Sequence, residues 1–228
     1  MSSHHFVKDK QEPALIIANG ESCSPSLLNS LLEWNPFIIV LDGAIHRVME
    51  LSIKFDVLLG DFDRIGNDIE QITSKYSNIK IVHAENQDKT DLEKGIDYLI
   101  DEGFDAVNIV WGTGRRADHT ITNITNICRF RSRITICMLD DYSTITLLPL
   151  LPKKFVKWYE KETPISLIPV GKASGISSKN LKYVLDNDEL TLGYRTGSSN
   201  EVLETGIVEI EYASGDLLLM ECTDVKNS

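Results

Sequence analysis

Short acidic segments follow apolar, strand-like runs at several points in the first 120 residues of this chain. The four segments are Asp42-Gly43, Gly60-Asp61-Phe62-Asp63, Asp88-Lys89-Thr90-Asp91 and Arg116-Ala117-Asp118-His119-Thr120. In an open parallel sheet the loops after the strands emerge along one edge, where ligands bind. Converging carboxylates repel one another unless a cation or a shared proton lies between them. Since Mg²⁺ combines carboxylate ligands with water and phosphate oxygens, the pattern predicts chemistry on a nucleotide polyphosphate.

Strand-like and helical segments alternate up to about residue 142. The expected strands are 14–18, 37–41, 56–59, 79–83, 106–111 and 134–139. Ser24-Pro25 has the residue types of a helix N-cap and first turn, and Thr90 with Glu93 has the spacing of a capping box. This alternation predicts a Rossmann-like parallel sheet with helices on both faces.

The pattern changes after residue 142. Short apolar runs at 143–150, 164–170, 181–185, 190–193, 206–212 and 216–220 are separated by turn residues and show no helical period. They predict an antiparallel β-sandwich or a small barrel. We therefore expect two domains, an α/β nucleotide- and metal-binding catalytic domain at 1–142 and a β-sandwich at 143–228.

Composition narrows the possible partners and the compartment. The net charge of −11 argues against a nucleic-acid partner, which needs a basic face. An anionic protein that binds an anionic nucleotide also needs a cation at the contact. No run has the apolar length of a membrane span, and the first residues lack the order of a signal peptide. The four cysteines form no CxxC pair, which is typical of thiols in a reducing cytoplasm.

Each motif also has a purely structural interpretation. Asp61 and Asp63 could be ordinary surface-turn residues, but their place after a strand and a glycine favours a metal role. Thr90 as N-cap and Asp91 in the first helical turn are explained by the helix start alone. Asp88 and Lys89 are not, and a lysine beside a helix N-terminus is also typical of a phosphate site.

The segment from Gly112 to Thr120 combines two glycines with Arg115 and Arg116. Glycines let the backbone approach a phosphate closely, and guanidinium groups provide several donors to it. Asp118 could simply cap the next helix, and His119 could be a packed histidine. The segment is neither a Walker A loop nor a GxGxxG fingerprint.

Weaker candidates lie in the β-rich part. Tyr183, Ser199 and Asn200 could form part of a substrate pocket. Locally, a strand-face aromatic and a turn explain them as well.

Taken together, these motifs resemble the thiamine pyrophosphokinase family. The resemblance includes the four acidic segments, Leu181-Lys182-Tyr183 and Ser199-Asn200, and runs from about Leu15 to about Leu219. The chain departs from the family pattern at Ala44, where a second glycine is common, and at Arg64, where a serine is common.

The resemblance implies transfer of a diphosphoryl group from ATP to the hydroxyethyl group of thiamine, which gives thiamine diphosphate and AMP with Mg²⁺. It also implies that 143–228 binds thiamine, and that a homodimer forms with the active site at the subunit interface. Asp61, Asp63, Asp88 and Asp91 would be the catalytic and metal-binding residues. The nucleotide side would include Asp42, Lys89, Thr90, Arg116, Asp118, His119 and Thr120, and the thiamine side Tyr183, Ser199 and Asn200.

Three other functions remain compatible with the motifs. A diphosphokinase for another heterocyclic alcohol, such as a hydroxymethylpterin, would keep the acidic segments and change the β-domain pocket. A metal-dependent phosphohydrolase would release AMP without an acceptor. A non-catalytic module that senses nucleotide or thiamine would bind without turnover, although sensing alone needs fewer carboxylates.

Overall fold

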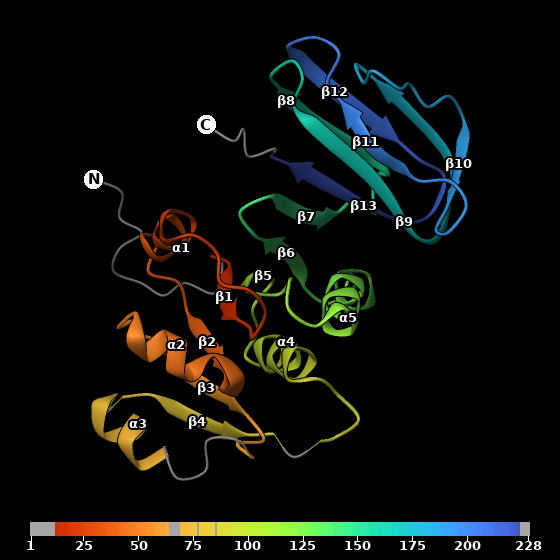
Figure 1. The fold of residues 1–228 in the computed structure, drawn as a ribbon. Coiled ribbons are helices and arrows are strands. Elements are labelled where there is room, and N and C mark those ends of the chain that lie inside the picture. The colour runs from red at the N-terminus through yellow and green to blue at the C-terminus, as the bar shows by residue number, and fades with distance from the viewer. Residues whose placement is uncertain (1–11, 64–68, 77, 85, 224–228) are drawn as a thin grey trace. The chain divides into compact units, whose positions relative to one another are not determined.

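The computed structural model describes residues 12–63, 69–76, 78–84 and 86–223. The chain forms two compact units (Figure 1). The first, called here the α/β unit, comprises Met1–Asn126 and Phe130–Asp140. The second, the β unit, comprises Ile127–Arg129 and Asp141–Ser228. Among the described residues, no helix is long and apolar enough to cross a membrane.

Parallel strands form the sheet of the α/β unit. They are β1 (Ala14–Ile17), β2 (Ile38–Leu41), β3 (Val57–Gly60), β4 (Lys80–His83), β5 (Ala106–Val110) and β6 (Thr135–Leu139), in the spatial order β4-β3-β2-β1-β5-β6. Strand β1 pairs with β2 on one side and with β5 on the other, so the strand order reverses there. In such sheets the crevice at the carboxyl ends of the two central strands is the usual ligand site.

Helices cover both faces of this sheet (Figure 1). They are α1 (Pro25–Leu32), the 3-10 turn η2 (Asp42–Ala44), α2 (Ile45–Glu50), α3 (Ile69–Lys75), α4 (Asp91–Asp101) and α5 (Ala117–Arg129). Leu28, Val48 and Ile72 from α1, α2 and α3 belong to one buried apolar cluster with Leu15 and Val40 of the sheet. Helix α4 packs on the opposite face, where its Gly95 lies beside the side chains of Ile16 and Leu41.

The β unit is antiparallel throughout its described strands. They are β7 (Ser143–Leu147), β8 (Lys154–Tyr159), β9 (Pro164–Lys179), β10 (Asp188–Thr191), β11 (Gly197–Glu201), β12 (Gly206–Glu211) and β13 (Ser214–Cys222). Strand β9 pairs with β10, β11 and β13 in one sheet, and its last residues pair with β12 in a second sheet that includes β8. The two sheets enclose an apolar core that includes Leu167, Ile176, Val208 and Leu217. The predicted fold class, a parallel α/β part followed by an antiparallel β part, is confirmed.

Several local predictions can be compared with the structure. Ser24 accepts a hydrogen bond from the Leu27 amide, and Thr90 with Glu93 forms the capping box, so both predicted helix starts are confirmed. The strand expected at 181–185 is wrong, because only Leu181 forms a bridge, with Val202. Strands β8 and β11 were missed, since β8 is exposed along most of both faces and β11 is polar.

Candidate functional site

A cleft of about 590 Å³ opens at the carboxyl ends of the parallel strands, within the α/β unit. Loops after β1, β2, β3, β4 and β5 all contribute to its wall. The lining includes these predicted site residues: Asp42, Asp61, Lys89, Thr90, Asp91, Arg116 and His119. Predicted site residues from Asp42 to His119, far apart in sequence, are thus brought to one edge of the sheet, as the motif pattern predicts.

Asp42 is the most deeply buried carboxylate of the cleft, at 7% exposure. Its Oδ2 accepts a hydrogen bond of 3.1 Å from the backbone N–H of Phe62. The pKa of Asp42 is raised, first by burial and then by the negative charge of Asp91, with a smaller contribution from Asp61. Carboxylates from three different loops therefore repel one another across this cleft.

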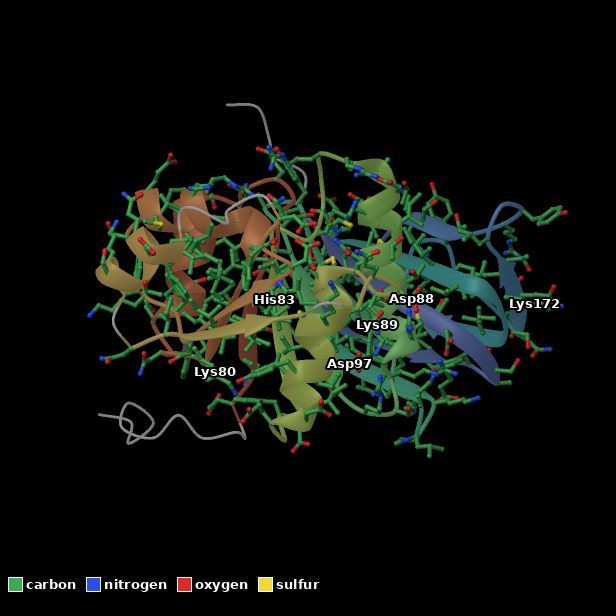
Figure 2. The ribbon with its side chains drawn as sticks, turned by 90° about the horizontal axis from the view of Figure 1, so that it is seen from below. Lys80, His83, Asp88, Lys89, Asp97 and Lys172 are labelled. Atoms are coloured by element: carbon green, nitrogen blue, oxygen red, sulfur yellow. The ribbon has the colours of Figure 1, made fainter. Side chains whose placement is uncertain are left out.

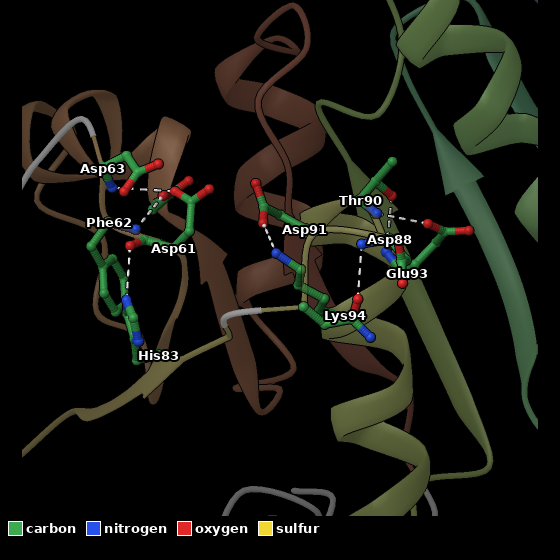
Figure 3. Close-up of polar contacts among 11 residues, drawn as sticks. Asp61, Phe62, Asp63, His83, Asp88, Thr90, Asp91, Glu93 and Lys94 are labelled. Carbon is green, nitrogen blue, oxygen red and sulfur yellow. Dashed lines mark hydrogen bonds and ion pairs between the residues drawn. The ribbon is translucent and has the colours of Figure 1, made fainter.

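The turn after β3 fixes the position of Asp61 (Figure 3). Gly60 lies directly against the Asp42 side chain, and a Cβ at this position would meet Asp42 Cγ at 2.4 Å. Phe62 adopts a left-handed backbone conformation, with φ 61°, and its side chain is buried. The Asp63 amide donates to Asp61 Oδ1 at 3.2 Å, and His83 Nε2 lies 2.9 Å from the Asp61 carbonyl oxygen. Left-handed backbone at a bulky residue costs about 1–3 kcal/mol and is typical of functional sites.

The N-terminus of α4 forms the next part of the wall (Figure 3). Thr90 N–H donates to Glu93 Oε2 at 2.7 Å, and Glu93 N–H donates to Thr90 Oγ1 at 3.3 Å. Asp91 Oδ1 accepts a hydrogen bond of 3.1 Å from Lys94 Nζ. The Lys94 side chain is only 9% exposed and lines the cleft, although the sequence analysis did not select it. The i, i+3 spacing of Asp91 and Lys94 at a helix start was the available signal.

Lys89, which precedes α4, is held by a carboxylate on that helix (Figure 2). Its Nζ lies 2.7 Å from Asp97 Oδ2, and Asp97 Oδ1 also lies 3.1 Å from an Arg133 nitrogen. Asp88, which does not line the cleft, donates its backbone N–H to Asn86 Oδ1 at 2.8 Å. An incoming phosphate would therefore compete with Asp97 for Lys89.

The loop after β5 carries two of the cationic groups that line the cleft, Arg115 and Arg116. Trp111, Gly114 and Arg115 all have left-handed φ values, of 56°, 76° and 55°. Arg115 donates to Asn19 Oδ1 at 3.2 Å, so this loop is linked to the loop after β1. Arg115 and Asn19 both line the cleft beside Arg116.

The predicted residues at the start of α5 are bonded to one another. Arg116 Nε donates to Asp118 Oδ1 at 3.1 Å, and the His119 amide donates to the same oxygen at 2.9 Å. The hydrogen bonds from Arg116, and next that from His119, lower the pKa of Asp118 to about 2. Thr120 Oγ1 contacts the carbonyl oxygens of Gly114 and Arg116, each at 3.2 Å. Asp118 and Thr120 lie outside the lining, where they hold the loop that presents Arg116 and His119.

The candidates in the β unit differ in exposure. Tyr183 is 61% exposed, whereas Asn200 is only 4% exposed. The Asn200 side chain accepts from the Tyr183 amide at 3.0 Å and donates to the Tyr183 carbonyl oxygen at 2.8 Å. Ser199 has φ 59° and donates its amide to Ser166 Oγ at 3.1 Å. Asn200 therefore fixes the backbone that carries Tyr183, and Ser199 lies in an irregular part of β11.

The cleft has the chemistry of a divalent-cation site. Among the described residues, no three His, Cys, Asp or Glu side chains already form a metal-binding cluster. Even so, burial first, and then repulsion from Asp91, raises the pKa of Asp42, and a bound cation would relieve that repulsion. Carboxylate oxygens are the ligands that Mg²⁺ takes in proteins, and it keeps several positions for water and phosphate. The side chains of Asp42, Asp61 and Asp91 therefore fit such an ion. Arg64 lies outside the described residues.

Comparison with known proteins identifies the family. The sequence model of the thiamin pyrophosphokinase catalytic domain matches residues 28–138, and that of the thiamin pyrophosphokinase vitamin B1 binding domain matches residues 154–217. The chain belongs to the thiamin pyrophosphokinase family. This confirms the resemblance drawn from the acidic motifs, and it makes the chain a member of a family of enzymes.

Individual members of the thiamin pyrophosphokinase family are distant relatives along nearly the full chain. Thiamin pyrophosphokinase 1 of Caenorhabditis elegans is 28% identical over 213 residues, covering 86% of this chain and 84% of the relative. Thiamine pyrophosphokinase of Bacillus subtilis is 29% identical over 213 residues, covering 92% and 98%. Its crystal structure superposes with a TM-score of 0.79 over 94% of this chain and 100% of that chain, at 26% identity. Yeast thiamin pyrophosphokinase shares the fold, with a TM-score of 0.78 at 15% identity, covering 96% and 89%.

Proposed function

We propose that this chain transfers the diphosphoryl group of ATP to the hydroxyethyl oxygen of thiamine, giving thiamine diphosphate and AMP. The observation that carries the proposal is the match of both family domains, catalytic and vitamin B1 binding, to successive parts of one chain. The cleft of the α/β unit supports it, because it combines carboxylates with lysines and arginines at the edge of a parallel sheet. We assign nucleotide chemistry to residues 1–142 and thiamine binding to 143–228.

The polyphosphate of ATP meets the cationic groups of the cleft. Lys89, Lys94, Arg115 and Arg116 balance its negative charge, and the N-terminus of α4 at Thr90 adds a favourable dipole. His119 lines the same wall. Asp42, Asp61 and Asp91 would hold Mg²⁺, with Asp63 and Asp88 in the same loops, as the family motifs imply. The ion, when bound, neutralises charge on the α-, β- and γ-phosphates.

In the reaction, the thiamine hydroxyl oxygen bonds to the β-phosphorus of ATP. The bond between the β-phosphorus and the oxygen that bridges it to the α-phosphorus breaks, and AMP leaves with that oxygen. The hydroxyl proton passes to a carboxylate of the cleft or to water. Positioning and electrostatic stabilisation supply most of the acceleration in such transfers, so the fixed loops around Asp61 and Arg116 are the main contribution of the chain.

The thiamine side is assigned to the β unit. Tyr183, exposed on its segment, would contact the vitamin, with Ser199 nearby on β11 and Asn200 holding the Tyr183 backbone. The proposal includes a cytoplasmic homodimer with active sites at the subunit interface. Sedimentation of the purified protein tests the dimer directly.

AMP formation by the purified protein, with ATP and Mg²⁺ and with or without thiamine, tests the proposed reaction. Thiamine-dependent AMP, matched by thiamine diphosphate, is the expected result. AMP without thiamine would favour hydrolysis. Absence of AMP from folded protein in both mixtures would favour another acceptor, such as a hydroxymethylpterin, or a sensing module, and competition between acceptors separates these.

Carboxylate substitutions test the assignment of the cleft. Asp61→Asn and Asp88→Asn should each reduce turnover by orders of magnitude, roughly 10²-fold or more, while the circular dichroism spectrum stays that of the wild type. Asp101→Asn, at the exposed end of α4, is the matched control and should keep wild-type turnover. Wild-type rates for both Asp61→Asn and Asp88→Asn at saturating Mg²⁺ would contradict the assignment.

A further inference from the structure

Arg47 contacts the loops after β1 and β5, both of which line the nucleotide cleft. It lies on α2, outside the lining of the cleft and outside every motif that the sequence analysis selected. Its Nη1 donates to the Gly20 carbonyl oxygen at 2.9 Å and to Ser22 Oγ at 2.8 Å. Its Nη2 donates to Asn19 Oδ1 at 2.9 Å. One guanidinium group thus holds three successive parts of the loop after β1.

The same guanidinium also contacts the loop after β5. The Arg47 Cζ lies 4.5 Å from the centre of the Trp111 ring, and Trp111 is buried with a left-handed φ of 56°. The two loops are joined directly next to it, because the Gly20 amide donates to the Trp111 carbonyl oxygen and the Glu21 amide donates to the Thr113 carbonyl oxygen at 2.7 Å. Arg47 therefore stabilises the junction at which the strand order of the sheet reverses.

Asn19 connects this junction to the phosphate-facing groups. Its Oδ1 accepts from Arg47 and, at 3.2 Å, from Arg115, which lines the cleft. Its side-chain amide packs so closely on Gly43, the neighbour of Asp42, that a Cβ on Gly43 would lie 2.2 Å from Asn19 Nδ2. A displacement of Asn19 would therefore reach the loops after β1, β2 and β5 together.

From these contacts we infer that Arg47 is a positioning residue for the nucleotide, acting through Asn19 and the junction of the β1 and β5 loops. A lysine could not replace it, because only a planar guanidinium can serve three acceptors while it stacks on a ring. The inference rests on the proposed function in one respect, namely that ATP occupies this cleft.

Arg47→Met and Arg47→Lys test the inference, with Lys75→Met as the matched control. Lys75 also donates to a backbone carbonyl of α2, that of Met49 at 3.1 Å, and also contacts an aromatic ring, that of Tyr76. Lys75 lies on α3, and neither Lys75 nor Met49 lines the cleft. All three proteins are compared as full chains.

Two readouts separate positioning from general destabilisation. Amide hydrogen exchange at Gly20 and Glu21 should accelerate by roughly tenfold or more in both Arg47 variants, because the charged hydrogen bonds that hold the loop are lost. The KM for ATP should rise about tenfold or more while the KM for thiamine changes less than about twofold. Lys75→Met should leave both quantities at wild-type values.

Wild-type exchange at Gly20 and Glu21 in Arg47→Met would overturn the inference. An equal rise of both KM values, or the same effects in Lys75→Met, would also overturn it. If the wild type forms no thiamine diphosphate, the proposed function fails instead. The exchange rates, together with equilibrium dialysis of ATP against wild type and Arg47→Met, then still decide whether Arg47 positions the nucleotide.

Discussion

Gly60→Ala should disable the cleft although it adds a single methyl group. The new Cβ would lie 2.4 Å from Asp42 Cγ and 2.5 Å from Asp42 Oδ2. Because carbon atoms pack at about 3.5–4.0 Å, the Asp42 carboxylate must move by roughly 1 Å. Asp42 is buried and bonded to the Phe62 amide, so the neighbouring turn has to move with it.

Gly60→Ala should lower both the stability of the fold and the turnover. Forcing a methyl group into a close-packed site costs about 1–3 kcal/mol of unfolding free energy. A displacement of about 1 Å near reacting groups can cost on the order of 10²-fold in rate. Gly60 does not have a left-handed φ, so the effect comes from the contact with Asp42 and not from the backbone conformation of Gly60.

Gly95→Ala provides the matched control. A Cβ on Gly95 would lie 3.4 Å from Leu41 Cδ2 and 3.5 Å from Ile16 Cδ1, which is ordinary contact. Alanine inside α4 should therefore raise the unfolding free energy by about 0.5–1 kcal/mol and leave turnover unchanged. The assays are urea unfolding and thiamine-dependent AMP formation. Wild-type kcat/KM in Gly60→Ala, or equal losses in both variants, would refute the reasoning.

The remaining predictions concern charge and hydrogen bonding. Folding raises the pKa of Asp42, so the folded state holds this proton more tightly and stability falls as pH rises through the raised pKa. Asp42→Asn should therefore unfold at a higher temperature than wild type at neutral pH. This difference in unfolding temperature should vanish in acid and shrink when Mg²⁺ is added. Turnover of the variant should be lost. The pKa of Asp118, about 2 beside Arg116, should return towards the ordinary carboxyl range in Arg116→Gln when measured by NMR titration; an unchanged value would rule out the ion pair. In wild type that pair persists until the pH falls to about 2. Asn200→Ala removes both hydrogen bonds to the Tyr183 backbone. It should lower the unfolding free energy of the β unit, measured in urea, by roughly 2–3 kcal/mol. An unchanged midpoint of urea unfolding would contradict the role of Asn200 in fixing that backbone.

The sequence by itself determined the parallel strands of the α/β unit and the edge of the sheet at which the chemistry lies. Apolar runs of strand length that alternate with capped helices can be buried only as a parallel sheet between helices. The acidic segments follow those runs, so the direction of the strands alone brings Asp42, Asp61 and Asp91 to one side. Thr90 and Glu93 identified a helix start because a capping box depends only on local spacing.

Only the tertiary structure decided which side chains support that edge. In the sequence Gly60 is only a glycine that follows a strand, whereas in the structure it leaves room for a carboxylate 18 residues earlier. Arg47 belongs to no sequence motif, and Lys94 gives only its i, i+3 spacing from Asp91. Their roles come from contacts with Asn19 and Asp91. The strand expected around residue 183 is absent, because the side chain of Asn200 binds that backbone instead. Such contacts depend on packing between segments that fold together, and local periodicity carries no information about them.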